Sequence, residues 1–256
     1  CFNNKKTKKL FMEGKKYLLI LLLASFSTGL LGQNNKSIYN AYISGKMAKW
    51  KITMDSVDAV KQKTDKDLLD LINYQYGYIG WSIGSNKNEE AEKYLKKATD
   101  NLNKLEEKKY KESMLFSYKA ALIGFEIGLA KYKAAFIGLN SLKYAKKSVS
   151  IDASNPLGYM QLGNVYYYMP KVFGGSKSLA LEHYLKSLKL MESSNDYKIN
   201  NWNYLGLLVT IINAYTDLNQ YEEAKKYCIK TLTIEPDFDW VKDNLYPEIL
   251  KKTKNE

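Results

Sequence analysis

The sequence contains no arginine, although 39 of its 256 residues are basic. Every basic residue is therefore a lysine, and the formal net charge is +12. A basic balance can favour nucleic acid as a partner. Arginine, however, is the side chain that reads guanine and phosphate with two parallel hydrogen bonds. Its absence disfavours a sequence-reading role, and we expect no nucleic-acid partner.

Histidine and cysteine are almost as scarce, since the chain has only His183, Cys1 and Cys228. Cys1 lies outside the expected mature chain and Cys228 falls at an apolar helix position, so we expect no disulfide and a buried, inert thiol. A single histidine without a reactive cysteine or a nucleophile turn assembles no catalytic constellation. The sequence therefore predicts a protein that is not an enzyme, with no cofactor and no metal site.

Long apolar runs are missing except near the amino terminus. Two lysines precede about ten apolar residues over 17–26, and small residues follow up to Gly32. This is the pattern of a secretory signal peptide, and the run is short of the roughly 20 residues that span a bilayer. We expect residues 1–32 to be a signal peptide. The alternatives are cleavage after Gly29, an uncleaved anchor, and a true start at Met12.

What the chain does contain is a repeated pair of amphipathic helices, whose apolar residues recur at spacings of three and four. The clearest copy spans residues 155–192, and a second copy follows it. Eight residues mark the two copies: Leu162, Gly163, Tyr166, Ala180 and Tyr184 in the first, and Tyr215, Ala224 and Pro236 in the second.

This order of residues resembles the tetratricopeptide repeat. Two hairpins match well and at least two match loosely, and together they cover most of residues 36–252. The resemblance implies an all-α solenoid of about five helical hairpins with a C-terminal capping helix, broken near Pro247, that shields the last repeat. We expect N-terminal hairpins over 33–110 and C-terminal hairpins over 111–252.

Two details of the C-terminal hairpins are predicted from glycine and proline. A turn over 133–138 should separate two helices, and Gly124 and Gly128 should let neighbouring helices pack closely. An insertion over 168–176 should follow, because Pro170 stops a helix and the glycines after Phe173 permit a positive φ. Ser176 is then expected to cap the next helix.

The stretch from Asn155-Pro156 through Met169-Pro170 and Phe173-Gly174-Gly175 to Ala180 is similar to exported tetratricopeptide proteins of Bacteroidetes. It also resembles the helical T component of TRAP transporters. These resemblances imply a periplasmic or secreted, non-catalytic protein of a Gram-negative bacterium.

The concave surface of stacked repeats commonly takes an extended peptide. The candidate binding residues are Tyr159, Met160, Asn164, Tyr167 and Tyr168 in the first copy, Phe173, Gly174 and Gly175 in the insertion, and Asn213 and Asp217 in the second copy. The alternative is that the tyrosines face a core and the insertion is only a longer turn.

Two functions fit these features. The first is a scaffold that holds a protein or peptide partner in the groove. The second is a transporter accessory protein that oligomerises and binds a small apolar solute. A closed apolar tunnel lined by Tyr159, Met160, Tyr167 and Tyr168 would favour the second. Contact with a membrane is expected only through an uncleaved signal segment.

Overall fold

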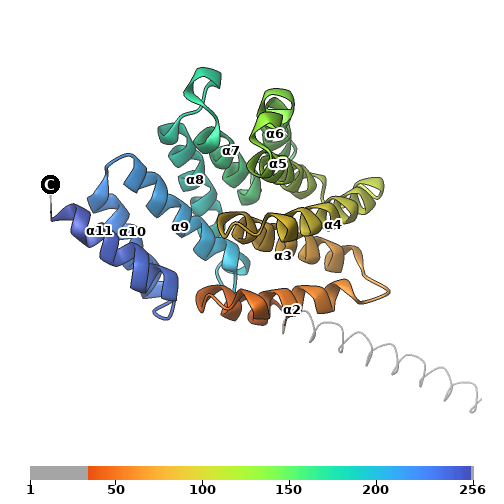
Figure 1. Cartoon of the computed structure of the whole chain (residues 1–256), viewed down its shortest axis with the longest axis horizontal. Helices are drawn as coiled ribbons and strands as arrows, with labels where there is room; N and C mark the ends of the chain where they lie inside the picture. Colours follow the sequence, from red (N-terminus) through yellow and green to blue (C-terminus); the bar gives the residue numbers. More distant parts are fainter. Residues whose placement is uncertain (1–33, 255–256) are drawn as a thin grey trace, which may run out of the picture.

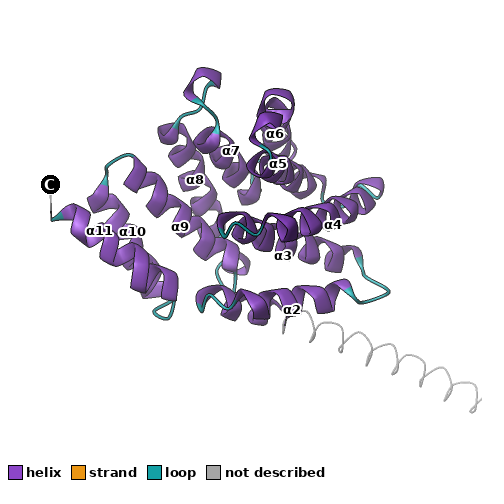
Figure 2. Cartoon of the chain, viewed as in Figure 1, coloured by secondary structure: helices purple, strands orange, loops and turns teal. Residues whose placement is uncertain are grey.

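Helices account for all the regular secondary structure in residues 34–254, the part of the chain that this computed structural model describes (Figure 2). A helical segment over 34–43 is followed by α2 (Met47–Asp58), α3 (Asp65–Gly84), α4 (Asn88–Glu107), α5 (Glu112–Leu129), α6 (Ala134–Ile151), α7 (Pro156–Tyr168), α8 (Lys177–Glu192), α9 (Trp202–Asp217), α10 (Tyr221–Ile234) and α11 (Tyr246–Thr253). Short turns η1 (Lys131–Lys133), η2 (Lys171–Phe173), η3 (Asn195–Tyr197) and the π turn η4 (Val241–Leu245) lie between them. Within these residues, no helix combines the length and the apolar character that a membrane span requires.

Consecutive helices pair as hairpins, and the hairpins stack along the chain (Figure 1). Helix α3 packs on α4, α5 on α6, α7 on α8 and α9 on α10. The second helix of a pair also contacts the first helix of the next, as α4 contacts α5, α6 contacts α7 and α8 contacts α9. Together with segment 34–43 and α2, this makes five hairpins within the described residues, and the predicted all-α solenoid is confirmed.

The predicted capping helix is also present. The π turn η4 leads into α11, and Pro247 lies in the first turn of α11, where proline needs no backbone partner. Ile249 is almost fully buried, and α11 packs against α10. The end of the stack is therefore covered where an apolar flank would otherwise meet water.

Capping side chains determine where several helices begin. Thr64 and Asp67 form a reciprocal capping box at the start of α3. Asn155 caps α7, and Pro156 occupies its first turn. Ser176 caps α8 as predicted. Each such cap stabilises its helix by about 1 kcal/mol, so these boundaries are encoded locally.

The predicted turn over 133–138 is wrong. The chain turns earlier, through the single 3-10 turn η1, and α6 is already helical from Ala134 onward. Gly138 lies inside this helix. The helix tolerates it, since a glycine in a helix interior costs only about 1 kcal/mol relative to alanine.

The glycines of α5 do not mediate close packing either. A Cβ at Gly124 would meet nothing within 4 Å, and one at Gly128 would make only ordinary contacts at 3.8 Å. Gly77 of α3 is different, since a Cβ there would lie 2.6 Å from the ring of Trp50 and 2.7 Å from that of Trp202. The indole rings of Trp50 and Trp202 therefore pack directly against the backbone at Gly77, which leaves no room for a side chain there.

The last hairpin returns to the first, so that the solenoid closes around an aromatic cluster. Trp202, at the start of α9, lies edge-on to Trp50 of α2 with ring centroids 5.0 Å apart. It is 5.8 Å from Tyr42 and 5.9 Å from Tyr76 of α3, and Phe238 packs on Tyr42 at 5.1 Å. Both tryptophans are buried. Side chains therefore fill the space between α2, α3 and α9.

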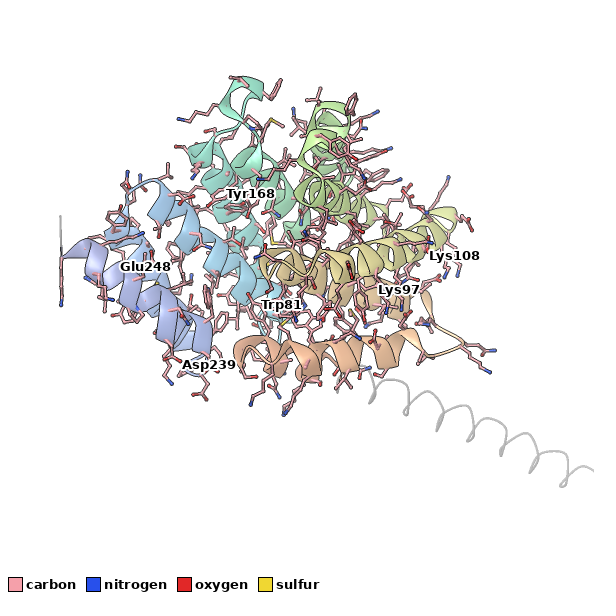
Figure 3. All side chains as sticks on the ribbon, in the orientation of Figure 1. Trp81, Lys97, Lys108, Tyr168, Asp239 and Glu248 are labelled. Atoms are coloured by element: carbon pink, nitrogen blue, oxygen red, sulfur yellow. The ribbon has the colours of Figure 1, made fainter. Side chains whose placement is uncertain are left out.

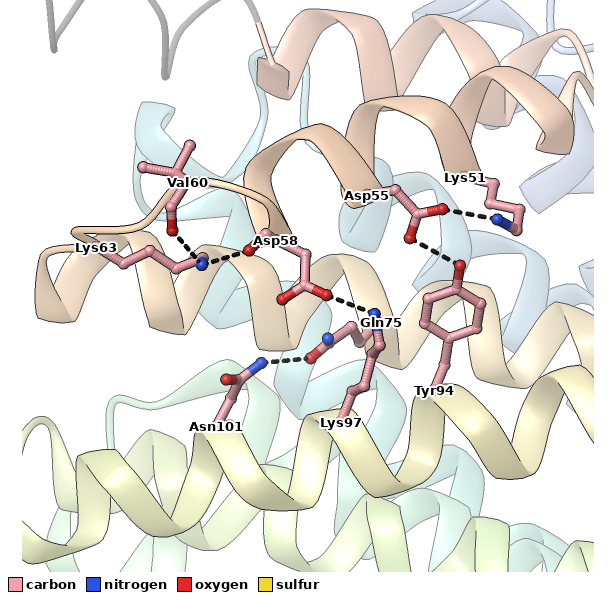
Figure 4. A network of polar contacts seen from close by, with 9 residues as sticks. All are labelled: Lys51, Asp55, Asp58, Val60, Lys63, Gln75, Tyr94, Lys97 and Asn101. Carbon is pink, nitrogen blue, oxygen red and sulfur yellow. Dashed lines mark hydrogen bonds and ion pairs between the residues drawn. The ribbon is translucent and has the colours of Figure 1, made fainter.

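A polar network fastens α2 to α4 (Figure 4). Asp55 accepts a hydrogen bond of 2.7 Å from the Tyr94 hydroxyl and pairs with Lys51 at 2.6 Å, while Asp58 pairs with Lys97 at 2.6 Å. Burial, aided by Asp55 and opposed by Lys51, raises the pKa of Tyr94 to about 12. The phenol therefore remains a donor at neutral pH. Each carboxylate has a partner, so the network holds two hairpins in register.

One hydrophobic core extends from Ile38 to Ile249 and includes residues on both sides of position 110. The division into hairpins over 33–110 and 111–252 stays a prediction. The expected signal peptide, residues 1–32, lies outside the described residues.

Candidate functional site

The residues that mark the predicted repeat lie at contacts between helices. A Cβ at Gly163 of α7 would come within 2.3 Å of Tyr184 Cε1 on α8, so a side chain at this position would collide with the tyrosine ring. Ala180 and Ala224 are completely buried, and Leu162 is nearly so. These positions therefore serve helix packing.

Aromatic pairs connect the two helices in each of the last two hairpins. Tyr166 of α7 stacks on His183 of α8 with centroids 5.4 Å apart, and Tyr215 of α9 stacks on Tyr227 of α10 at the same distance. Partial burial lowers the pKa of His183, although the neighbouring carboxylate of the same helix opposes this. Pro236 follows α10 and is exposed. His183 is thus a packing residue in this arrangement.

Three of the predicted groove residues make contacts within the protein; Met160 is buried, which corrects its assignment to an open groove, whereas Tyr159 and Asn164 are half-buried and stay predictions. Met160 belongs to the core and is 5% exposed. Asn164 accepts a hydrogen bond from the Tyr184 hydroxyl (2.9 Å) and donates one to Gln161 (3.0 Å). Tyr159 packs in the small cluster between α5, α6 and α7. Periodicity identified the helix face correctly as apolar, but it could not show that neighbouring hairpins cover that face.

Two other predicted residues meet across the gap between hairpins. The Tyr167 hydroxyl of α7 donates to Asp217 Oδ2 of α9 at 2.5 Å, and Lys177 Nζ of α8 pairs with the same oxygen at 2.5 Å. Burial of Asp217 opposes its ionisation, but the hydrogen bonds from Lys177 and Tyr167 outweigh this and lower the pKa of the carboxyl. Partial burial and the bond to Asp217 raise the pKa of the Tyr167 phenol. Asp217 is therefore a carboxylate at neutral pH, with the phenol as a donor.

Tyr168 and Asn213 extend this arrangement onto the surface. Tyr168 is 79% exposed, and its ring lies 4.8 Å from that of Tyr167 in an edge-to-face contact. Asn213 is exposed one helical turn before Asp217 on α9, so the two share a helix face. We call the five residues Tyr167, Tyr168, Lys177, Asn213 and Asp217 the α7–α9 surface; Figure 3 labels Tyr168 on the hairpin of α7 and α8.

The insertion forms an ordered turn. Pro170 ends α7, η2 follows, and Gly174 adopts a φ of +96° as predicted from the glycine pair. Gly175 has another role, because a Cβ there would lie 1.7 Å from the carbonyl oxygen of Met169. Phe173 is 69% exposed at the end of this turn. The insertion therefore presents Phe173 outward.

The four residues that would line an apolar tunnel, and so favour a solute carrier, do not face one another. Tyr159 lies beside α6, Met160 in the core, Tyr167 against α9, and Tyr168 in solvent. A shallow, open and mainly polar depression does lie between segment 34–43 and the residues after α10, where Asn40, Lys49 and Asp237 line it. Within residues 34–254, no three His, Cys, Asp or Glu side chains converge as metal ligands would.

Lys177 is the member of the α7–α9 surface that the sequence did not indicate. It follows the helix cap Ser176 and looks like any solvated lysine of a first turn. Its partner Asp217 lies 40 positions away, and no local pattern reports such a pairing.

Comparisons with known proteins show the fold alone. No protein-family model matches the chain, and no curated protein matches it. Among solved structures, the HusA haemophore from Porphyromonas gingivalis is similar, with a TM-score of 0.55 and 16% sequence identity over 70% of this chain and 92% of that one. At this identity the likeness concerns the arrangement of helices.

Proposed function

We propose that the chain is an exported, non-catalytic binding protein that holds a segment of another protein on the α7–α9 surface. The observation that supports this most is the exposed ring of Tyr168 beside the ion pair of Lys177 and Asp217. A tyrosine offers a large contact area at low conformational cost and is enriched among residues that dominate binding. The neighbouring groups are held in place before a partner arrives.

The mixed chemistry of this surface favours a polypeptide over a purely apolar ligand. Asn213 and Asp217 lie on one helix face, where an amide and a carboxylate can bond the backbone groups of an extended segment. Lys177 and Tyr167 fix the position of the carboxylate. Export rests on the signal peptide predicted over residues 1–32, and the absence of catalytic chemistry rests on the scarcity of histidine and cysteine.

The test is to compare the partners that wild type, Tyr168→Ala and Trp240→Ala capture from an extract of the protein's own host. Trp240 is the matched control, because it is an aromatic residue that is 52% exposed outside the α7–α9 surface. We expect at least one partner to be lost with Tyr168→Ala alone, and its purified form to bind that variant at least about 30-fold more weakly, as for a residue that dominates an interface. Identical partners and affinities for all three proteins would refute the proposal.

A second candidate is a carrier of a small apolar solute, and the similarity to a haemophore favours it. In this role the exposed ring of Tyr168 would stack on a flat, mainly apolar ligand. If the ligand carries carboxylates, exposed lysines would pair with them. A transporter accessory protein that oligomerises around such a solute is the same class of function.

Titration with hemin separates the two candidates. A carrier should shift the absorption of hemin at a fixed stoichiometry, and Tyr168→Ala should weaken this binding while Trp240→Ala should not. Absence of a saturable shift with wild type would eliminate the haem-carrying version and leave the protein partner.

A further inference from the structure

Two neighbouring hairpins end in turns of similar composition. The turn η1 between α5 and α6 reads Lys131-Tyr132-Lys133, and η2 between α7 and α8 reads Lys171-Val172-Phe173. Both are single 3-10 turns, and Figure 1 shows both at the same side of the molecule. Hairpins in a stack present equivalent ends on one side, so the two turns belong to one face.

Large apolar side chains project into solvent from both turns and from the start of α6. Tyr132, Phe136, Leu139, Val172 and Phe173 are between 69% and 86% exposed, and we call these five residues the tip surface. Single exposed apolar residues are ordinary, but groups of them on neighbouring hairpin ends that face the same side can mark an interaction site. This group differs from the α7–α9 surface, which carries a carboxylate, and the two surfaces share no residue.

The backbone holds these side chains outward. In the second turn, the Phe173 amide donates to the Pro170 carbonyl at 2.9 Å, and Ser176 N donates to Tyr166 O at 2.9 Å. In the first, Phe136 and Leu139 belong to the first turns of α6 itself. Because the backbone is hydrogen-bonded, neither tip can fold its apolar side chains back onto the core without breaking these bonds.

Lysines predominate around the tip surface, and the acidic residue nearest the first turn, Glu126, is paired with Lys133 at 3.5 Å. Residues 127–181 contain seven lysines and a single acidic residue, Asp152. Asp152 follows the far end of α6, which a rise of 1.5 Å per residue places about 25 Å from the tip. Four lysines near the tips are exposed and make no ion pair with another residue of 34–254: Lys131, Lys143, Lys146 and Lys171.

Apolar and basic residues are ordered along α6. Its exposed face begins with Phe136 and Leu139 and continues with Lys143 and Lys146, at the helical spacings of three, four and seven. The lysines are set back by about 10 Å from the aromatic end. An anionic bilayer has the same order, with acyl chains inside and phosphates about 5–10 Å farther out.

We infer that the tip surface docks on an anionic lipid bilayer, with Phe136, Leu139, Val172 and Phe173 entering the interface and the lysines contacting lipid phosphates. Lysine suits this role, since its flexible stem lets the ammonium group reach the headgroups while the stem stays in apolar surroundings. Membrane contact would then not be limited to the amino-terminal segment.

The experiment measures flotation of the full chain with phosphatidylcholine vesicles that contain either no anionic lipid or about 30 mol% phosphatidylglycerol. The tip variant is Phe136→Ser with Phe173→Ser. Its matched control is Ile52→Ser with Ile199→Ser, two exposed residues outside the tips. The amino-terminal apolar segment is common to all these proteins, so differences between them report the tips.

We expect the tip variant to bind anionic vesicles at least about tenfold more weakly than wild type, and the control to match wild type. Lys131→Gln with Lys171→Gln should weaken binding by about fivefold per lysine, and binding should fall as salt rises. Phe173→Trp should add an emission that shifts to shorter wavelength with anionic vesicles, whereas the emission added by Ile52→Trp should not shift.

Three results would overturn the inference. The tip variant and the control could float alike. The tip variant could lose a protein partner while its vesicle binding is unchanged, which would assign the surface to that partner. Light scattering could show that the tip substitutions dissociate a dimer, which would mean that a second copy covers the surface. Failure of the Tyr168→Ala test would leave this result unaffected, because Tyr168 is not part of the tip surface.

Discussion

Alanine at Gly163 and alanine at Gly124 should change stability in opposite directions. Both glycines lie inside helices, where alanine is intrinsically favoured by about 0.8–1 kcal/mol. Their surroundings differ: a Cβ at Gly163 would lie 2.3 and 2.4 Å from two ring carbons of Tyr184, whereas one at Gly124 would meet nothing within 4 Å. The intrinsic preference of the helix for alanine is the same at both sites. The difference in stability between the two variants therefore measures the effect of packing.

The magnitude at Gly163 follows from the contact. The ring of Tyr184 would have to move by more than about 1 Å to reach an ordinary distance, and overpacking of this kind costs about 1–3 kcal/mol. Tyr184 is completely buried, and its hydroxyl bonds Asn164. Loss of that bond adds about 1 kcal/mol. After the helix preference is subtracted, Gly163→Ala should destabilise the protein by about 2 kcal/mol, whereas Gly124→Ala should stabilise it by about 0.5–1 kcal/mol.

The assay is unfolding followed by far-ultraviolet circular dichroism, by heat and by urea. For a chain of this size, about 2 kcal/mol should lower Tm by roughly 4–8 °C. A Tyr184→Leu background should reduce the loss caused by Gly163→Ala, because the colliding ring atoms are gone. If both alanine variants shift Tm in the same direction, or if the Tyr184→Leu background changes nothing, the packing argument is wrong.

Further predictions concern single side chains. Because burial lowers the pKa of His183, the unfolded chain binds its proton more readily, so stability should fall as pH drops below about 6.5, and His183→Gln should flatten this part of a Tm-against-pH curve. Trp202→Ala should destabilise by about 3–5 kcal/mol and speed hydrogen exchange in α2, which a purely local loss would leave unchanged. Asn155→Ala should cost about 2–3 kcal/mol, because it removes both the α7 cap and an amide that bonds three buried serines; a loss below 1 kcal/mol would contradict this. Burial raises the pKa of the Cys228 thiol to about 12, so its reaction with a disulfide reagent should follow unfolding.

Helix boundaries were predictable where a residue acts on its own neighbourhood. Asn155-Pro156 and Ser176 cap the helices that follow them, and the apolar periodicity identifies the helices themselves. The start of α6 was not predictable in this way, because no capping side chain marks it. Gly138 has a helical backbone and carries no positive φ, so neighbouring residues and packing decided the outcome.

The candidate site was only partly predictable, because its geometry depends on how hairpins turn against one another. Tyr167 and Asp217 were expected on one surface, and they do meet. Met160 was expected beside them on the same helix, but it faces the core. A period of 3.6 residues identifies an apolar stripe without stating whether the stripe faces a groove or another hairpin. The curvature of the stack decides this, and it emerges from contacts between residues far apart in the sequence.

Closure of the solenoid explains where binding can take place. In an open stack the inner helices line a groove, but here Trp202 and Phe238 bring the last hairpin onto Trp50 and Tyr42 of the first. The interior is therefore filled by side chains that pack against one another and stabilise the fold, and they are not available to a ligand. Two of the surfaces that remain accessible, the α7–α9 surface and the tip surface, lie where hairpins end. The α7–α8 hairpin contributes to both surfaces, so the insertion that follows Tyr168 sets the separation between a partner held by the first and a bilayer contacted by the second.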